Sequence, residues 1–207
     1  MKVVYVDVNY LVNIKFPKEF IDDLPETIGL FTTAQYLNQL DHMKTQLEDA
    51  GKHVKLFKAK HTEVPGQILG CNIQEFTGVQ AILYVGDGSF HPKALAMKND
   101  IPIFSYNPLS KKYEHITVKP RTGLIQAFNT AKSIGVLITT KPGQQKIEQA
   151  LELGKRFPQK NFYFLIANEI NNLENFPFID FYVNTACPRI ATDDLDKPSM
   201  NLEELPA

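Results

Sequence analysis

The stretch "IGLFTTAQYLNQLDHMKTQLEDAGKHVKLF", residues 28–57, decides the fold class of this 207-residue chain. Its first apolar run predicts a buried strand over 28–33, and "HVKLF" predicts a second strand over 53–57. Between them, 34–51 predicts an amphipathic helix that stops at a glycine, because apolar residues recur there at helical spacing (Leu37, Leu40, Met43, Leu47). A strand, a helix and a strand in this order indicate an α/β unit with a parallel sheet.

The same pattern occurs again in "IGVLITTKPGQQKIEQALELGKRFPQKNFYFL", residues 134–165. Both stretches begin with Ile-Gly, continue through an apolar strand that ends in Thr-Thr, and reach a second strand after an amphipathic helix. We therefore expect two related small α/β domains, at roughly 20–120 and 121–207. Residues 1–19 are predicted to be one terminal strand or the remnant of a missing first domain.

Further elements complete each predicted domain. They are strands at 79–85, 101–106 and 177–183, and helices at 92–100, 121–133 and 142–157. Parallel sheets of this kind carry helices on both faces, and we expect the two sheets to face each other across a cleft. The tail "DDLDKPSMNLEELPA" (193–207) is acidic and contains proline, so it is predicted to lie over the surface or to fray.

The overall composition excludes several classes of protein. The formal net charge is −1, which argues against binding to nucleic acid or to a membrane surface through bulk positive charge. No apolar run approaches the roughly 18–20 residues that span a bilayer, and the N-terminus does not have the pattern of a signal peptide. Two cysteines do not form a disulfide framework, so we expect a cytoplasmic protein with reduced thiols.

Four loops come after predicted strands and are the candidate binding regions. In open parallel sheets, ligands bind beyond the carboxyl ends of the strands. The loops are "GQILGCN" (66–72), "YVGDGSFHP" (84–92), "TTKPGQQ" (139–145) and "NTACPRI" (184–190). If the two domains face each other, all four loops line one cleft.

The two cysteines have two interpretations on their own. An isolated cysteine in a cytosolic protein is most often a small buried hydrophobe. Cys71 and Cys187 lie instead in loops beside glycine or proline, where thiolates also act as ligands of iron–sulfur clusters or metals. No CxxC pattern is present, so a self-contained zinc site is not expected.

The polar residues of the other loops are weaker candidates. Gly86, Asp87 and Gly88 suit either an ordinary tight turn or close contact with a ligand, and His91 lies further along the same loop. The segment around Lys141, Gly143 and Gln144 suits an anion if a helix begins at "PG", although an ordinary helix start fits equally well. Arg189 is a candidate for pairing a carboxylate, or is simply solvated.

Together the four motifs resemble one family. They occur in the same order in the archaeal and eukaryotic diphthamide synthases, which are 2-(3-amino-3-carboxypropyl)histidine synthases. The resemblance implies three similar α/β domains that each give one cysteine to a 4Fe–4S cluster. It further implies that S-adenosylmethionine binds the fourth iron, and that a 3-amino-3-carboxypropyl radical is transferred to a histidine of translation elongation factor 2.

Carried over residue by residue, the resemblance matches Cys71 to the second domain's iron ligand and Cys187 to the third domain's. No part of this sequence resembles the family's first domain, so we expect a split enzyme in which a separate chain supplies the third cysteine. The resemblance also makes Arg189, Lys141, Gln144 and the N–H groups near Gly143 candidates for holding S-adenosylmethionine. Three further residues are expected to form the walls of the same cleft (Gly86, Asp87, Gly88).

Three alternatives to the split enzyme remain. In the first, a homodimer of this chain supplies the third ligand. In the second, the chain is a non-catalytic partner subunit or degenerate relative that binds and stabilises a catalytic chain. A hydrolase or nucleotide-binding α/β protein is the third possibility, and it rests on fold analogy alone.

Overall fold

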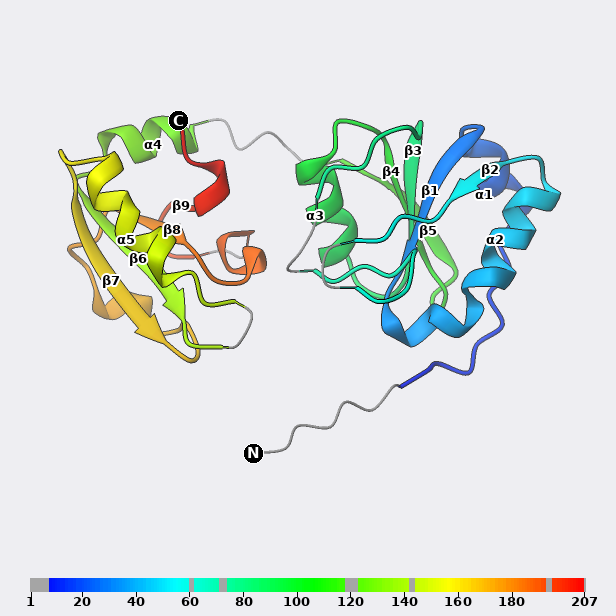
Figure 1. Cartoon of the computed structure of the whole chain (residues 1–207), viewed down its shortest axis with the longest axis horizontal. Coiled ribbons are helices and arrows are strands. Elements are labelled where there is room, and N and C mark those ends of the chain that lie inside the picture. The colour runs from blue at the N-terminus through cyan, green and yellow to red at the C-terminus, as the bar shows by residue number, and fades with distance from the viewer. Residues whose placement is uncertain are drawn as a thin grey trace. The chain divides into compact units, whose positions relative to one another are not determined.

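The structure is a computed structural model that describes residues 8–59, 62–70, 74–117, 123–141, 144–192 and 195–206. The chain divides into two compact units, Met1–Val118 and Lys119–Ala207 (Figure 1). The observed division lies close to the position between 120 and 121 expected from the repeat. Among the described residues, no helix has the length and apolar character needed to cross a membrane.

The first unit is a five-stranded sheet in the order β2-β1-β3-β4-β5. Four strands are parallel and β5 is antiparallel to β4. The strands are β1 (Thr27–Thr32), β2 (His53–Lys55), β3 (Ala81–Val85), β4 (Ile103–Asn107) and β5 (Lys112–Ile116). The helices are α1 (Lys18–Asp23), the 3-10 helix η1 (Ala34–Gln39), α2 (Leu40–Asp49) and α3 (Phe90–Lys98).

Both faces of this sheet are covered, as the sequence predicted. Strand β3 reads Ala-Ile-Leu-Tyr-Val and is buried along its whole length, because its alternate side chains enter two different cores. Leu83 packs with α1 and α2 on one face, and Ile82 packs with α3 on the other. Burying each such aliphatic side chain stabilises the fold by about 2 kcal/mol.

The second unit is a four-stranded, fully parallel sheet in the order β7-β6-β8-β9. Its strands are β6 (Ser133–Thr139), β7 (Asn161–Ala167), β8 (Phe181–Asn184) and β9 (Ser199–Asn201). Its α-helices are α4 (Leu124–Thr130) and α5 (Ile147–Arg156), and its 3-10 helices are η2 (Leu173–Asn175), η3 (Pro188–Thr192) and η4 (Leu202–Glu204).

The two faces of the second sheet are covered differently. Helices α4 and α5 pack Phe128 and Leu153 onto one face. On the other face, the described cover is irregular chain and short 3-10 turns, which place Leu173, Phe176 and Ile190 over the buried Tyr182. The expectation of helices on both faces therefore holds in full for the first unit and only with 3-10 turns for the second.

Both units repeat the order helix, strand, helix, strand. One residue before the second strand of each stands a lysine, Lys52 or Lys160, whose ammonium binds main-chain carbonyls at the C-terminal end of the unit's first helix. One residue before the third strand stands Gln80 or Asp180, whose side-chain oxygen accepts the N–H that begins the first strand. These matched contacts give the sequence repeat a structural basis.

The terminal strand expected within residues 1–19 falls partly on residues 1–7, which lie outside the described residues; no strand forms in residues 8–17, where Ile14 and Phe16 enter the core of the first unit. Two sequence predictions were wrong in detail. The tail neither frays nor lies on the surface throughout, because 199–201 becomes β9, pairs with β8 and buries Met200. The predicted helix at 142–157 begins only at Ile147. Helix α1 and strand β5 had not been predicted.

Candidate functional site

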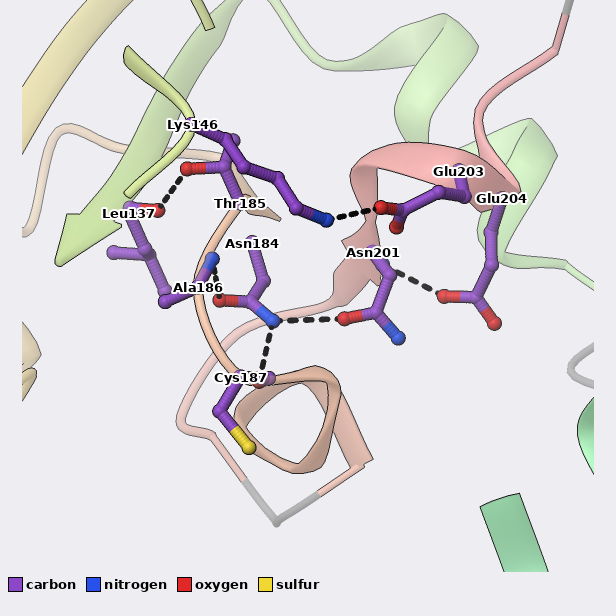
Figure 2. A network of polar contacts seen from close by, with 9 residues as sticks. All are labelled: Leu137, Lys146, Asn184, Thr185, Ala186, Cys187, Asn201, Glu203 and Glu204. Atoms are coloured by element: carbon purple, nitrogen blue, oxygen red, sulfur yellow. Dashed lines mark hydrogen bonds and ion pairs between the residues drawn. The ribbon is translucent and has the colours of Figure 1, made fainter. Parts of the chain in front are cut away.

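Two asparagines end neighbouring strands at the carboxyl edge of the second sheet (Figure 2). Asn184 is the last residue of β8 and Asn201 the last residue of β9, and the parallel register places them opposite each other. The Asn184 Nδ2 donates a hydrogen bond of 2.7 Å to the Asn201 Oδ1. Both side chains are buried, so this bond satisfies polar atoms that water does not reach.

The same Asn184 amide also shapes the loop that carries Cys187. Its Nδ2 donates to the Cys187 carbonyl at 2.8 Å, and its Oδ1 accepts the Ala186 N–H at 3.1 Å. The Cys187 carbonyl accepts a second bond from the Ile190 N–H at the start of η3. One side chain therefore fixes the backbone on both sides of the cysteine.

Thr185 ties this loop to the neighbouring strand. Its N–H and its Oγ1 both donate to the Leu137 carbonyl of β6, at 3.0 and 2.9 Å. The loop is thus held by main-chain and side-chain bonds to β6, β8 and β9. A loop held in this way presents its next side chain in a defined direction.

The Cys187 thiol is half-buried, and Figure 2 shows its Sγ pointing away from the Asn184–Asn201 pair. A rigid, partly accessible thiol at the carboxyl end of a parallel strand fits the role of one iron ligand. Within the described residues, no group of three or more His, Cys, Asp or Glu side chains could hold a metal ion. Cys187 is the cysteine that the described part of the chain includes, and its role as an iron ligand stays a prediction.

Residues of the C-terminal tail make polar contacts at this edge of the sheet. The Asn201 N–H donates to the Glu204 Oε2 at 2.6 Å in a capping box for η4. The Lys146 ammonium, just before α5, pairs with Glu203. The acidic tail residues thus support the strand that positions Asn201, which explains why the tail is ordered here.

Lys141, Gln144 and Arg189 lie at this same edge of the sheet, since they come after β6 and β8. Arg189 is exposed in η3, Lys141 is exposed, and Gln144 is half-buried. Gly143 lies outside the described residues. The predicted anion site at a helix start is wrong in position: the Gln144 N–H donates to the Lys141 carbonyl in a turn, and α5 starts three residues after Gln144.

In the first unit, the turn after β3 contains the three predicted residues Gly86, Asp87 and Gly88. The Asp87 Oδ1 accepts bonds from its neighbour's N–H and from the Asn107 Nδ2, both at 2.9 Å. Gly88 has φ +73°, a conformation that favours glycine. At Gly86 a Cβ would stand 2.4 Å from the Tyr84 hydroxyl. Each residue therefore has a role within the turn itself, and contact with a cofactor stays a prediction.

Aromatic side chains fill the space beside this turn. The rings of Tyr84 and His91 stack at 5.5 Å, and the Tyr84 hydroxyl lies 3.3 Å from the His91 Nδ1. Burial lowers the pKa of His91, because it disfavours the charged imidazolium. Burial, together with the nearby Asp87 carboxylate, raises the pKa of Tyr36 to about 12. The Tyr36 hydroxyl is buried without a hydrogen-bond partner among the described residues.

Cys71 lies outside the described residues, but the chain just before it is placed. The Thr32 N–H donates to the Gly66 carbonyl and the Ile68 N–H donates to the Thr32 carbonyl, so 66–68 runs along the end of β1. A Cβ at Gly70 would stand 2.2 Å from the Phe90 ring of α3. The structure therefore brings the "GQILG" loop and the "GDGSF" turn together within the first unit.

Sequence reasoning missed the residues that organise both edges. Asn184 was quoted in "NTACPRI", yet it received no role, and Asn201 lay in a tail that was predicted to fray. The signal that could have identified Asn184 is an asparagine that directly ends a predicted buried apolar strand. No comparable pattern marked Tyr36, because its electrostatic interaction with Asp87 joins residues about fifty positions apart in the sequence.

Comparison with known proteins identifies relatives of both units. A family model described as "Putative diphthamide synthesis protein" matches residues 1–205. A 2-(3-amino-3-carboxypropyl)histidine synthase of Pyrococcus horikoshii is 32% identical over 84% of this chain and 54% of the relative. Subunit 1 of the synthase of Schizosaccharomyces pombe is 30% identical over 93% of this chain and 49% of the relative.

The solved structures agree with these matches. The crystal structure of Dph2 from Pyrococcus horikoshii superposes with a TM-score of 0.80 at 30% identity, over 90% of this chain and 58% of that one. A second structure of the same protein, with a 4Fe–4S cluster, superposes with a TM-score of 0.78. The chain spans about half the length of the curated relatives it matches.

Proposed function

Because the chain belongs to the family described as putative diphthamide synthesis proteins, we propose that it acts in the first step of diphthamide biosynthesis. In this step a 3-amino-3-carboxypropyl group passes from S-adenosylmethionine to a histidine of translation elongation factor 2. The relatives are named as synthases of the corresponding modified histidine, and one solved neighbour contains a 4Fe–4S cluster. The observation that carries the proposal is the Cys187 loop, rigidly held and with a partly accessible thiol.

Cys187 and Cys71 are the proposed iron ligands. The sequence holds two cysteines, whereas the resemblance implies three protein ligands to a 4Fe–4S cluster. The third thiolate is therefore proposed to come from outside residues 1–207, on a separate chain of first-domain type. When bound, the cluster supplies the electron that cleaves the sulfonium of S-adenosylmethionine.

The chain's own residues hold and orient the substrate in this proposal. Arg189 and Lys141 carry positive charges at the edge that bears Cys187, which suits the carboxylate of S-adenosylmethionine. Gln144 and Gly143 offer uncharged polar groups beside them. Asn184 does not touch substrate; it is a positioning residue that holds the Cys187 backbone. Gly86, Asp87 and Gly88 stay candidate contacts from the first unit.

Anaerobic reconstitution tests the proposal. The chain with iron, sulfide and reductant should develop little 4Fe–4S absorption alone, and should develop it when a first-domain chain from the same genome is added. The mixture should then release the 3-amino-3-carboxypropyl group from S-adenosylmethionine. Cys71→Ala or Cys187→Ala should abolish both signals, while Thr45→Ala, an exposed change on α2, should leave them intact.

Two results would redirect the assignment. If the cysteine variants leave the activity of the mixture unchanged, the ligand assignment is wrong and the chain is a non-catalytic partner subunit. Activity on a substrate without iron or S-adenosylmethionine would instead favour a hydrolase or nucleotide-binding protein.

A further inference from the structure

A cavity of about 380 Å³ opens beside the carboxyl half of β7 in the second unit. Apolar side chains form most of its wall, and they come from β6, from β7 and from the chain that follows β7 (Leu137, Leu165, Leu173, Phe176). The polar side chains of the wall are one carboxylate and three amides (Glu169, Asn171, Asn172, Asn175). A volume of this size with apolar walls and a few polar groups is typical of a small-molecule site.

Strand β7 also offers main-chain groups at the cavity. The Thr140 N–H of the β6 side donates to the Ala167 carbonyl, so the odd-numbered residues of β7 bond toward β6. Main-chain groups alternate in direction along a strand, which turns those of Phe164 and Ile166 away from β6, and both residues line the cavity. Within the part of the chain that the structure describes, no strand pairs with that side of β7.

The shape of the cavity favours a compact ligand over an extended protein segment. Only the last four residues of β7, 164–167, line it. The chain then folds back, because Leu173 and Phe176 pack on the same cluster as Leu165. A partner strand would need the whole length of β7 to pair, whereas a planar molecule needs one donor and one acceptor at its edge and apolar contacts on its faces.

The cavity adjoins the edge of the sheet that carries the candidate site. The Leu137 side chain lines the cavity, and the Leu137 carbonyl accepts both bonds from Thr185, two residues before Cys187 (Figure 2). The Thr139 Oγ1 accepts the Lys141 N–H at 3.2 Å and donates to the first carbonyl after β7 at 3.4 Å. Single residues therefore connect the cavity to the Cys187 loop and to the Lys141 turn.

We propose that this cavity binds the methylthioadenosine part of S-adenosylmethionine, with the adenine against the free edge of β7. The proposal rests on the proposed function, which names this cofactor. Adenine presents its N6 amino donor beside a ring-nitrogen acceptor. An extended strand presents the carbonyl of one residue and the N–H of the residue two further along on the same edge. The Phe164 carbonyl accepts from N6, and the Ile166 N–H donates to the ring nitrogen.

This arrangement holds the half of S-adenosylmethionine that is not transferred. Transfer of the 3-amino-3-carboxypropyl group breaks its bond to the sulfonium and leaves the sulfur as the neutral thioether of 5′-methylthioadenosine. The apolar wall contacts the purine faces and the thioether in the same way before and after transfer. We therefore expect 5′-methylthioadenosine to remain in the cavity as a product inhibitor that competes with S-adenosylmethionine.

Amide NMR on the whole iron-free chain tests this site with 5′-methylthioadenosine as the probe. The amide signal of Ile166 should shift most on titration, and S-adenosylmethionine should shift the same signal. 5′-Methylthioinosine, in which donor and acceptor are exchanged on the base, should bind at least about 10-fold more weakly. Ala167→Phe should weaken binding at least about 10-fold, because the added ring takes the space of the purine. Asn161→Phe places the same ring at the exposed start of β7 and should leave binding unchanged.

The outcomes separate this site from the proposed function, because the titration needs neither a cluster nor a second chain. An Ile166 signal that does not move with either adenosine compound at millimolar concentration overturns the cavity assignment, even if the reconstituted mixture is active. Binding that is unchanged in Ala167→Phe does the same, since the nucleoside must then lie elsewhere. Equal binding of 5′-methylthioinosine overturns the adenine contact with β7. Binding as expected, in a chain whose reconstituted mixture never cleaves S-adenosylmethionine, supports the cavity assignment and contradicts the proposed function.

Discussion

The two units share one framework and differ in the segment just after their third strand. After β3, aromatic rings fill the turn, with Tyr84 stacked on His91. After β8, the side-chain amides of Asn184 and Asn201 bond each other and hold a short polar loop. In the aromatic turn, the polar groups contact one another. Beside the amide pair, by contrast, the Cys187 thiol stays partly accessible. A repeated fold thus reaches different chemistry through a few residues at one strand end.

The largest effect is expected at the amide pair. Asn184→Ala removes three hydrogen bonds and leaves the buried Asn201 amide without its partner, so it should destabilise the second unit by about 3 kcal/mol. Hydrogen exchange read by mass spectrometry assigns the loss to one unit. Asn38→Ala, an exposed change in the first unit, is the control. Equal loss of protection in both units would contradict a local role.

The next largest effect is expected at Lys52 and Lys160, which occupy equivalent positions in the two units. Lys160 is buried, binds three carbonyls and lies over the Phe128 ring, whereas Lys52 binds one carbonyl. Lys160→Met should therefore cost about 2 kcal/mol and Lys52→Met about 1 kcal/mol in chemical denaturation monitored by hydrogen exchange. A larger cost at Lys52 would mean that the two positions are not equivalent.

A smaller effect is expected at Thr185. Thr185→Val removes the Oγ1 bond to the Leu137 carbonyl but keeps the main-chain bond to the same atom, so about 1 kcal/mol should be lost. Thr32→Val in the first unit removes a similar buried bond to the Val85 carbonyl and should cost about as much. Comparable losses would show that both strand ends are fixed in the same way.

Between about pH 5 and 7, the pH dependence of stability should belong to the first unit, because all five histidines of the chain lie in it. The folded-state pKa of His91 lies below its ordinary 6.5 because of burial, so the unfolded chain takes up the proton first as the pH falls. The stabilisation is complete above pH 6.5 and is lost progressively below it. His91→Gln should flatten this dependence in thermal unfolding at pH 5–7, while His42→Gln, at an exposed position, should not. An unchanged slope in the His91 variant would show that another group titrates.

The sequence predicted the helices and strands that a pattern within their own residues marks. Apolar runs identified β1, β3 and β6, and the repeat identified two units. Helix α1 was missed because a single turn and a half gives no clear periodicity, and β5 because its residues are mostly exposed. Strand β9 exists only through pairing with β8, which the tail's acidic composition did not suggest.

The candidate site was predicted to a similar extent. The positions of Cys187 and Arg189 after a strand were predicted from the pattern. The Asn184–Asn201 bond was not, because it depends on the register of β9, and the helix start at Pro142 was misplaced because a turn at Lys141 precedes α5. Contacts that depend on long-range register are the ones that a single sequence does not reveal.

The central claim is that the Cys187 loop supplies an iron ligand. Site-resolved alkylation by iodoacetamide, read by mass spectrometry, tests it directly in the chain mixed with a first-domain chain before and after anaerobic reconstitution. Cys187 and Cys71 should react before reconstitution and become protected as the 4Fe–4S absorption develops. If the absorption develops while Cys187 remains as reactive as before, Cys187 does not bind iron and the proposed site is wrong.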